Sequence, residues 1–269
     1  MWRLYVDIGN SALKWAARSE GNWISQGSLS HFMVRAADAA DLLVPVVIRA
    51  EAAVQKLAHA LQADGLDPEQ CDGIVVVSSF SEVDDLVRLL GKLAPVPLRR
   101  LGGDFVPTLT SEYYRPAEIG MDRWANAAAA ARLHGTPAVV VDAGTCITSE
   151  VINSEGKLVG GCIALGLPRL LAAISGVSER LAEAAAQEMP EEPPPTTGRS
   201  TAEAIRAGVI LQAAATADRF IAEGRHQVGA QKAIITGGDA ELCLTYMQET
   251  ALYEPLLTLE GLRILDEYD

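Results

Sequence analysis

The segment Leu4-Tyr5-Val6-Asp7-Ile8-Gly9-Asn10-Ser11 decides the fold, because an apolar run ends there in a glycine turn. The same arrangement returns at Val139-Val140-Val141-Asp142-Ala143-Gly144-Thr145. A third apolar run ends in the same way, at Ala233-Ile234-Ile235-Thr236-Gly237-Gly238. A strand that stops at a tight glycine turn leaves backbone N–H groups and a hydroxyl facing outward, where they can meet a phosphate. Turns of this kind, in this order, predict a nucleotide held between two similar halves.

The residues around these turns predict an internal duplication of architecture in an α/β protein. Three consecutive strands are expected near the start of the chain and three more in its middle, each set followed by strand–helix alternation. The expected strands are 3–7, 13–18, 22–28, 73–78, 96–101, 138–142, 146–152, 158–164, 232–236 and a last short one over 253–258. The expected helices are one or two within 36–63, then 82–93, 122–134, 167–174, 178–186, 201–223 and 240–247, with a proline-rich loop over 188–198.

Composition limits the classes of function. The 269 residues allow one large domain or two ordinary ones, and 49% hydrophobic with only 5% aromatic residues predicts aliphatic cores. The net charge of −13 disfavours nucleic acid and anionic membranes as partners, although it leaves room for a local ATP pocket.

Cysteines and hydropathy indicate the compartment. The four cysteines form no C-x-x-C pair, which is typical of unpaired thiols in a reducing compartment. Met1-Trp2-Arg3 leads directly into a strand, and no apolar stretch approaches about 18 residues. We therefore expect a cytoplasmic protein without a signal peptide or a transmembrane helix.

The first two turns carry residues suited to phosphate chemistry. Asp7 at a strand end can hold a divalent ion or its water, Asn10 and Ser11 can bind phosphate oxygens, and Lys14 follows closely. Asp142 and Thr145 repeat this pattern. Each turn alone is also explained by ordinary hairpin geometry. Independent hairpins do not explain the ordered set.

Two further motifs extend this hypothesis. Gly237 and Gly238 let an adenine or ribose lie flat on the backbone, although a plain strand-to-helix turn also needs glycine. Asp122 can take a proton from a substrate hydroxyl and Arg123 can pair with a substrate anion, although an acid there also complements a helix dipole. The histidines show no metal-ligand spacing, and the motifs G-x-S-x-G, Walker A and G-x-G-x-x-G are absent from the sequence.

The ordered turns resemble those of the actin, Hsp70 and sugar-kinase superfamily, and within it the chain closely resembles the type III pantothenate kinases. The resemblance runs nearly end to end. The matching segments are Asp7 to Lys14, Gly120 to Ala127, Asp142 to Thr148, Gly160 to Gly166, Ser200 to Ile205, Thr236 to Gly238 and Leu256 to Leu262.

This resemblance implies two similar ribonuclease-H-like domains, 1–115 and 116–269, each a mixed sheet flanked by helices, with the nucleotide cleft between them. It also implies transfer of the ATP γ-phosphate to pantothenate, the first step of coenzyme A biosynthesis, by a homodimer with pantothenate near the interface. Asp122 would be the general base. The implied ATP-binding residues are Asp7, Ile8, Gly9, Asn10, Ser11, Ala12, Leu13, Lys14, Thr145, Gly237 and Gly238. The implied pantothenate-binding residues are Tyr113, Gly120, Met121, Asp122, Arg123 and Thr201, with Tyr114 as the alternative to Tyr113.

Two cations are implied as well. Mg²⁺ would accompany ATP and be held by Asp7 through water, whereas Asp142 would hold a monovalent cation, K⁺ or NH₄⁺. The chain departs from the family pattern at four positions. These are Ser11 for threonine, Cys146 for a small residue, Glu150 for aspartate and Leu165 for proline.

Three other functions fit the same residues. The chain could phosphorylate another small hydroxylated metabolite, or act without catalysis as an accessory factor in gene expression through a protein partner. A phosphatase acting on polyphosphate or a guanosine alarmone would need a more basic cleft than this composition supplies.

Overall fold

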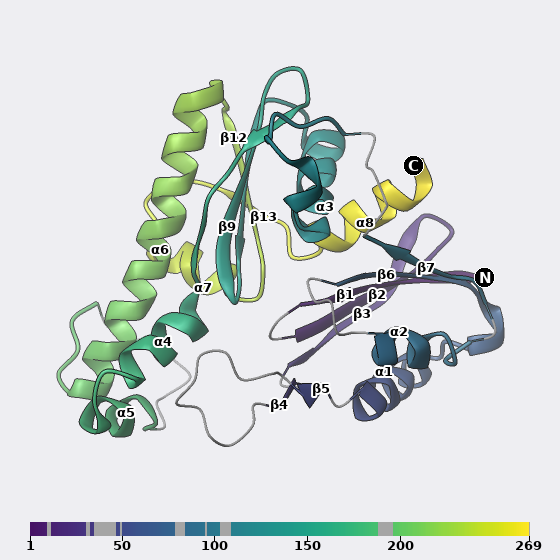
Figure 1. The fold of residues 1–269 in the computed structure, drawn as a ribbon, viewed down its shortest axis with the longest axis horizontal. Helices are drawn as coiled ribbons and strands as arrows, with labels where there is room; N and C mark the ends of the chain where they lie inside the picture. Colours follow the sequence, from purple (N-terminus) through teal and green to yellow (C-terminus); the bar gives the residue numbers. More distant parts are fainter. Residues whose placement is uncertain are drawn as a thin grey trace. The chain divides into compact units, whose positions relative to one another are not determined.

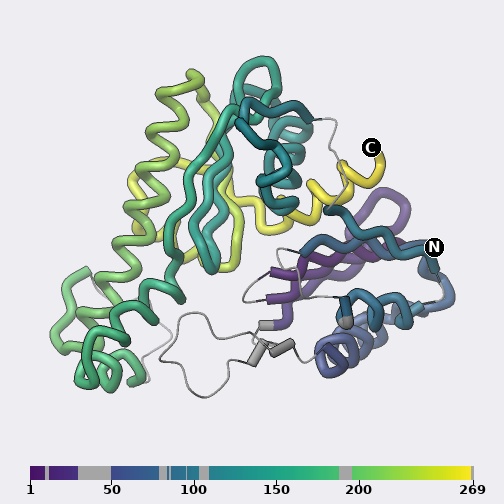
Figure 2. The backbone as a smooth tube through the Cα atoms, viewed as in Figure 1, coloured from purple at the N-terminus to yellow at the C-terminus, as the bar shows by residue number. Residues whose placement is uncertain are grey.

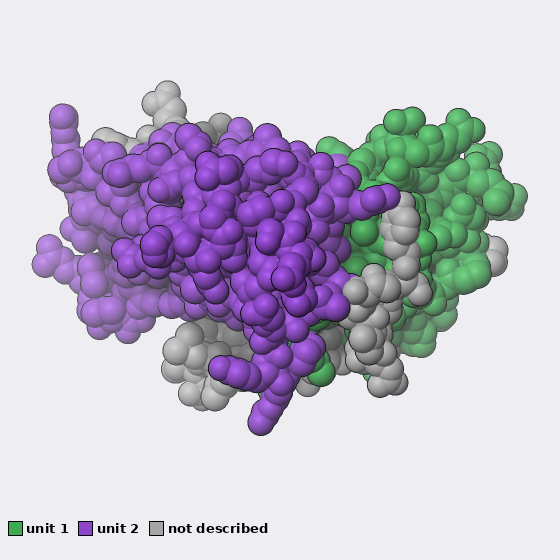
Figure 3. Space-filling model, turned by 90° about the horizontal axis from the view of Figure 1, so that it is seen from above, with its two compact units in different colours: residues 1–108, 117–125, 258–269 green, residues 109–116, 126–257 purple. Residues whose placement is uncertain are grey.

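The computed structural model describes residues 1–9, 12–30, 33–34, 47–48, 50–78, 84–94, 96–102, 109–187 and 196–268. Contacts divide the chain into unit 1, residues 1–108, 117–125 and 258–269, and unit 2, residues 109–116 and 126–257 (Figure 3). This division differs from the expected domains 1–115 and 116–269, which meet at a single boundary. Two later segments, 117–125 and 258–269, return to unit 1.

Unit 1 is built on a five-stranded sheet with the strand order β3-β2-β1-β6-β7 (Figure 1). The first three strands pair antiparallel as a meander, whereas β6 lies parallel to β1 and β7 parallel to β6. The strands are β1 Trp2–Ile8, β2 Ala12–Ser19, β3 Asn22–Ser30, β6 Cys71–Ser78 and β7 Leu98–Leu101, with a separate pair β4 Met33–Val34 and β5 Val47–Ile48. The helices between them are α1 Ala50–Ala63, the 3₁₀ turn η1 Pro68–Gln70 and α2 Asp84–Leu90.

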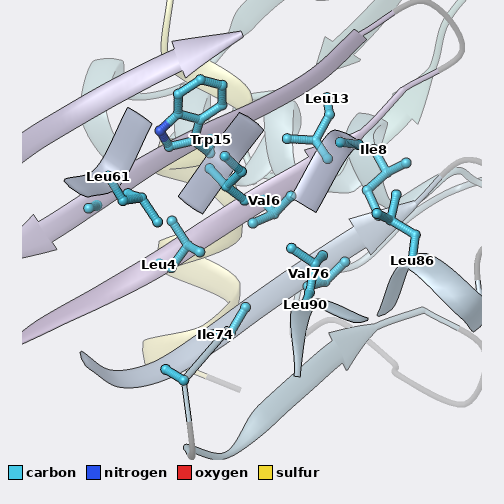
Figure 4. Close-up of a cluster of buried hydrophobic side chains, with 14 of the residues drawn as sticks. Leu4, Val6, Ile8, Leu13, Trp15, Leu61, Ile74, Val76, Leu86 and Leu90 are labelled. Atoms are coloured by element: carbon cyan, nitrogen blue, oxygen red, sulfur yellow. The ribbon is translucent and has the colours of Figure 1, made fainter. Parts of the chain in front are cut away.

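One face of this sheet forms an aliphatic core with α1 and α2. Alternation along β1 directs Leu4, Val6 and Ile8 to this face. Figure 4 shows them with Leu61 of α1 and Leu86 of α2. The large side chains in this layer are buried. Their packing fixes the end of β1, where Asp7 lies.

The opposite face of the same sheet is covered by the last helix, α8 Leu257–Tyr268 (Figure 1). Tyr5 points to this face and is buried there, with its ring edge-on to Trp23 at 5.6 Å between centroids. Asp266 of α8 pairs with Arg3 at 3.0 Å and with Arg99 at 2.9 Å. The last helix of the chain therefore belongs to unit 1, together with the first strands.

Unit 2 repeats the architecture with the strand order β10-β9-β8-β12-β13, and β11 also pairs with β9. Again β8, β9 and β10 are antiparallel, whereas β12 lies parallel to β8 and β13 parallel to β12. The strands are β8 Ala138–Ala143, β9 Cys146–Ile152, β10 Leu158–Gly160, β11 Ile163–Leu165, β12 Lys232–Thr236 and β13 Leu252–Tyr253. The helices are η2 Pro116–Glu118, α3 Met121–Ala129, the π-helical turn η3 Ala130–His134, α4 Leu167–Ser175, α5 Glu179–Ala185, α6 Thr201–Val228 and α7 Ala240–Tyr246. Two of these helices, η2 and α3, contain residues of both units.

The long helix α6 covers one face of the second sheet. Gly224 of α6 lies against Val139 and Val151, where an added Cβ would come within 2.8 Å and 3.1 Å of their methyl groups. Val141 and Ala143 face the same core. Since side chains alternate along β8, Asp142 lies on the opposite face.

The predicted α/β class with two mixed sheets flanked by helices is confirmed, because each sheet combines antiparallel and parallel pairs. The two strand orders are also equivalent. Lys232–Thr236 matches its predicted range, and the predicted hairpin turn at Asn153 to Gly156 is closed by a 3.0 Å hydrogen bond from the Gly156 N–H to the Asn153 carbonyl. The helix predicted over 82–93 ends at Leu90, and residues 82–83 lie outside the described residues. The helix predicted over 122–134 is formed by α3 and the π-helical turn η3, which together run from Met121 to His134. The helix predicted over 201–223 continues to Val228, where Gly229 ends it with φ +69°.

Two predictions were wrong. The strand expected over 253–258 is only Leu252–Tyr253, and the helix α8 that follows it was not predicted. The strand expected over 158–164 is divided into β10 and β11, since Gly161 and Cys162 interrupt it.

Of the region 36–63, α1 is described, whereas 35–46 and 49 lie outside the described residues, as do 188–195 of the proline-rich loop. In the part of the chain that the structure describes, no helix is both long and apolar enough to cross a bilayer.

Candidate functional site

The first predicted phosphate turn joins β1 to β2. Asp7 is the next-to-last residue of β1 and lies opposite Lys14 in the antiparallel register. The Gly9 N–H donates a 3.0 Å hydrogen bond to the Ala12 carbonyl, which closes the turn. Asn10 and Ser11 lie outside the described residues.

The aliphatic members of this motif have a structural role. Ile8 and Leu13 are completely buried in the core of unit 1, and they are paired across the hairpin. Their side chains therefore anchor both arms of the turn. The polar side chains of Asp7 and Lys14 lie opposite each other across this strand pair, and both are half-buried.

The second predicted turn joins β8 to β9 in unit 2. Asp142 lies near the end of β8, opposite Thr148. The side-chain amide of Asn126 donates a 3.3 Å hydrogen bond to Oδ2 of Asp142, and Asn126 is only 1% exposed. The Gly144 N–H donates to the Cys146 carbonyl at 3.0 Å, which leaves Thr145 at the tip.

The third motif meets the second within unit 2. Because β8 and β12 are parallel neighbours, Thr236 pairs with Asp142 and both strands end at the same edge of the sheet. Gly237, with φ +103°, lies so close that an added Cβ would be 2.5 Å from Oδ1 of Asp142 and 2.2 Å from the Ala143 carbonyl. The Asp239 N–H donates to that carbonyl at 2.9 Å. Thus the structure brings Asp142, Thr145 and Gly237 together.

Two residues at this edge were not predicted as site residues. One is Asn126, which donates to Asp142. Its position about one helical turn after Asp122 is the sequence feature that could have indicated it. The other is Gly166, whose added Cβ would lie 1.8 Å from the Gly144 carbonyl, and whose N–H donates to the Thr145 carbonyl at 3.0 Å. Both support the second turn from segments distant in sequence.

Two of the family departures lie in regular structure. Leu165 belongs to β11 and pairs with Cys146 of β9, so the strand pairing is retained without the usual proline. Glu150 of β9 is completely buried. It is paired with Val140, two residues before Asp142, and therefore lies on the same face of the sheet as Asp142.

Asp122 lies in the first turn of α3. Its Oδ1 accepts a 2.9 Å hydrogen bond from the Arg123 N–H, and an added Cβ at Gly120 would be 2.4 Å from the same oxygen. The Gly120 carbonyl accepts from the N–H groups of Arg123 and Trp124, both at 3.1 Å. A side chain at position 120 would therefore displace the Asp122 carboxylate, which is half-buried.

Tyr113 and Thr201 lie in unit 2, in a loop and at a helix start. The Tyr113 N–H donates to Oγ of Ser111 at 3.0 Å, and Tyr113 is half-buried whereas Tyr114 is fully exposed. Thr201 is the first residue of α6, directly after the N-cap Ser200, whose Oγ accepts from the Glu203 N–H. The hydrogen bonds of this cap hold the exposed Thr201 at a fixed helix end.

The described residues contain no group of three or more His, Cys, Asp or Glu side chains that would hold a metal ion by themselves. Mg²⁺ bound with a nucleotide needs only one or two carboxylates besides phosphate oxygens and water. The single carboxylate of Asp7 fits that requirement by donor type.

A cavity of about 250 Å³ lies at the other end of β12 from Gly237. Its charged groups already have partners: Arg225 pairs with Glu249, and the Lys232 ammonium donates to the His134 carbonyl. The lining residues are His134, Arg225, Gln231, Lys232, Ala233, Ile234, Thr250, Ala251 and Leu252, and none of them is a predicted site residue.

Comparison with known proteins matches the sequence to one family. The family model of type III pantothenate kinases matches residues 3–223. The chain belongs to the type III pantothenate kinase family. It is 31% identical to a type III pantothenate kinase of Roseiflexus sp. strain RS-1, over 98% of each chain. It is 30% identical to that of Acidothermus cellulolyticus, over 98% of this chain and 97% of the relative.

Solved structures agree on the fold. A Campylobacter jejuni protein described as a Baf family transcriptional activator superposes with a TM-score of 0.54, at 20% identity over 98% of each chain. The archaeal actin homologue Ta0583 superposes with a TM-score of 0.50, at 13% identity over the full length of both chains. The resemblance to the actin-like kinase fold is therefore confirmed. The family phosphorylates pantothenate in coenzyme A biosynthesis, with ATP and a divalent metal.

Proposed function

We propose that this chain transfers the γ-phosphoryl group of ATP to the primary hydroxyl of pantothenate. The observation that carries the proposal is the family match over residues 3–223, which includes both phosphate turns and the Asp122 segment. Within it, two sheets of equivalent strand order each bear an aspartate near the end of the first strand, Asp7 and Asp142. This repeat supports the proposal that two similar turns bind one polyphosphate.

The nucleotide would be held mainly by backbone and small polar groups. In phosphoryl transfer the protein contributes chiefly alignment and charge stabilisation. In this proposal Asn10, Ser11 and Lys14 of the first motif would bind phosphate oxygens, as would the Thr145 hydroxyl of the β8–β9 turn. Gly237 and Gly238 would let the adenosine lie close to the backbone, since a side chain at position 237 has no space.

Two cations would assist. A bound Mg²⁺ would neutralise charge on the phosphates, and Asp7 would hold it through water. Asp142 would hold a K⁺ or NH₄⁺ ion, with its Oδ2 oriented by Asn126. Both carboxylates lie at strand ends, where backbone carbonyls and solvent can complete the coordination.

Asp122 would act as the general base on pantothenate. The Arg123 N–H donates to one carboxylate oxygen and so orients the side chain. In this proposal the other oxygen would accept the proton of the substrate hydroxyl. Arg123, Tyr113 and Thr201 would bind the rest of pantothenate, with Gly120 and Met121 lining the site. We further propose a homodimer with pantothenate bound near its interface, which sedimentation of the purified protein would test.

The test is a side-by-side assay of phosphopantothenate formation from ATP, with simple sugars as competing acceptors, in potassium and in sodium. We expect pantothenate alone to be phosphorylated, and potassium to raise the rate. Phosphorylation of a sugar in place of pantothenate would overturn the proposal.

The variant Asp122→Asn tests the base. It should fold normally and lose about 10²- to 10⁴-fold in kcat. The matched control is Glu51→Gln, an exposed acid in the first turn of α1, which should leave kcat unchanged. Near-normal turnover of folded Asp122→Asn would show that Asp122 only complements its helix dipole.

A further inference from the structure

Helix α8 crosses α3 at a point where the two backbones nearly touch (Figure 2). The crossing residue of α8 is Gly261, and an added Cβ there would lie 2.0 Å from the carbonyl oxygen of Ala125 and 2.6 Å from its Cα. Ala125 is completely buried. These separations are to backbone atoms, so no side-chain rotation could relieve them. Any residue larger than glycine at position 261 must move a helix.

The helix that would move is α3, because α8 is anchored along its length. At its carboxyl end, Asp266 pairs with Arg3 of β1 and Arg99 of β7, and its side chain is only 5% exposed. Near its start, Glu260 accepts a 2.5 Å hydrogen bond from the Trp23 indole. Its apolar side chains Leu259, Leu262 and Leu265 are buried. These contacts attach α8 to three strands of the unit 1 sheet.

The part of α3 that touches Gly261 also carries the proposed base. Asp122 lies three residues before Ala125, so the two residues are about one turn apart on a single hydrogen-bonded helix. A displacement of Ala125 is therefore transmitted to the Asp122 carboxylate. We propose that Gly261 is a positioning residue for Asp122: the missing side chain lets α3 approach α8 closely enough to place the base. This inference rests on the proposed function.

The variant Gly261→Ala tests it. Because a misplacement of about 1 Å can cost about 10²-fold in rate, we expect kcat to fall at least tenfold. The KM for ATP should change less than twofold, since the ATP-binding residues lie on other elements. The matched control is Gly208→Ala in α6, where an added Cβ meets no atom within 4 Å, and its kcat should equal that of the wild type. A wild-type kcat in folded Gly261→Ala would overturn the inference.

A double-mutant cycle separates positioning from general damage. If Gly261 acts through Asp122, adding Gly261→Ala to Asp122→Asn should lower the residual turnover less than twofold, measured with radiolabelled ATP. Equal losses in both backgrounds would show that Gly261 acts elsewhere, which also overturns the inference. Failure of the proposed function would be distinguishable, because the wild type itself would then form no phosphopantothenate.

A second variant carries the test if Gly261→Ala does not fold. Asp266→Asn removes both ion pairs at the end of α8, whereas Arg3 keeps its ion pair with Asp72, and Arg3 and Arg99 are each about 40% exposed to water. With α8 less firmly anchored, kcat should fall two- to fivefold, and this loss should disappear in the Asp122→Asn background. An unchanged kcat, or an equal loss in both backgrounds, would overturn the inference.

Discussion

The side-chain amide of Asn126 donates to Oδ2 of Asp142, and a Cβ added at Gly237 would lie only 2.5 Å from Oδ1 of the same carboxylate. One aspartate at the end of β8 is thus held between a helix and the turn after β12. Residues 126, 142 and 237 are far apart in the sequence. Their meeting orients the Asp142 carboxylate, as the proposed cation site requires.

Replacing Asn126 by leucine should abolish the response of the protein to potassium. The variant keeps the volume but removes the donor, so Asp142 loses its orientation and the fold loses about 1–3 kcal/mol. The measurement is the melting temperature in rising KCl against choline chloride, without nucleotide. The wild type should be stabilised specifically by potassium. An Asn126→Leu protein with the wild-type potassium shift would contradict the assignment.

Gly237→Ala should destabilise the fold far more than Gly238→Ala. A Cβ at position 237 would overlap the Ala143 carbonyl at a φ of +103°, whereas at position 238 it meets no atom within 4 Å. We expect a loss of more than about 3 kcal/mol in the first variant and less than about 1 kcal/mol in the second. Urea denaturation measures both. Equal losses would mean that the turn adapts.

The cysteines should differ in reactivity by environment. Cys162 is exposed, whereas Cys243 is completely buried, and burial raises the pKa of its thiol to about 12. Burial also raises the pKa of Cys71. Since the thiolate is the nucleophile, a thiol reagent at pH 8 should label Cys162 rapidly and Cys243 only on unfolding. Peptide mapping after brief labelling checks this, with a Cys162→Ser variant as control, and fast labelling of Cys243 would contradict the buried position of α7.

Stability should fall at alkaline pH through Tyr5. Burial, and then the charge of Asp266, raise the pKa of Tyr5 to about 12, against about 10 in the unfolded chain. The unfolded state therefore releases this proton first, so the contribution is complete below pH 10 and is lost between about pH 10 and 12. Tyr5→Phe should remove that part of the pH dependence of the unfolding free energy. Tyr114→Phe, at a fully exposed side chain, is the control, and identical profiles for Tyr5→Phe and wild type would contradict the prediction.

Local pattern predicted most elements because their signals are local. The apolar runs that end at Asp7, Asp142 and Thr236 are strands that end where the glycine turns require. Helix α8 was missed because the contacts that hold it are made with residues far away in the sequence. Its charged residues Glu260 and Asp266 pair with Trp23 and Arg3, which lie near the start of the chain.

By itself, the sequence determined which segments become strands, where they turn, and which family the order of turns belongs to, because side-chain periodicity and glycine stereochemistry act within a few residues. Only the tertiary structure decided that Gly237 and Asn126 enclose Asp142, and that Gly261 admits the helix of Asp122. Those relationships depend on which strands become neighbours and which helices cross. That choice is made by packing between residues far apart in the chain, where no local pattern records the distance between two backbones.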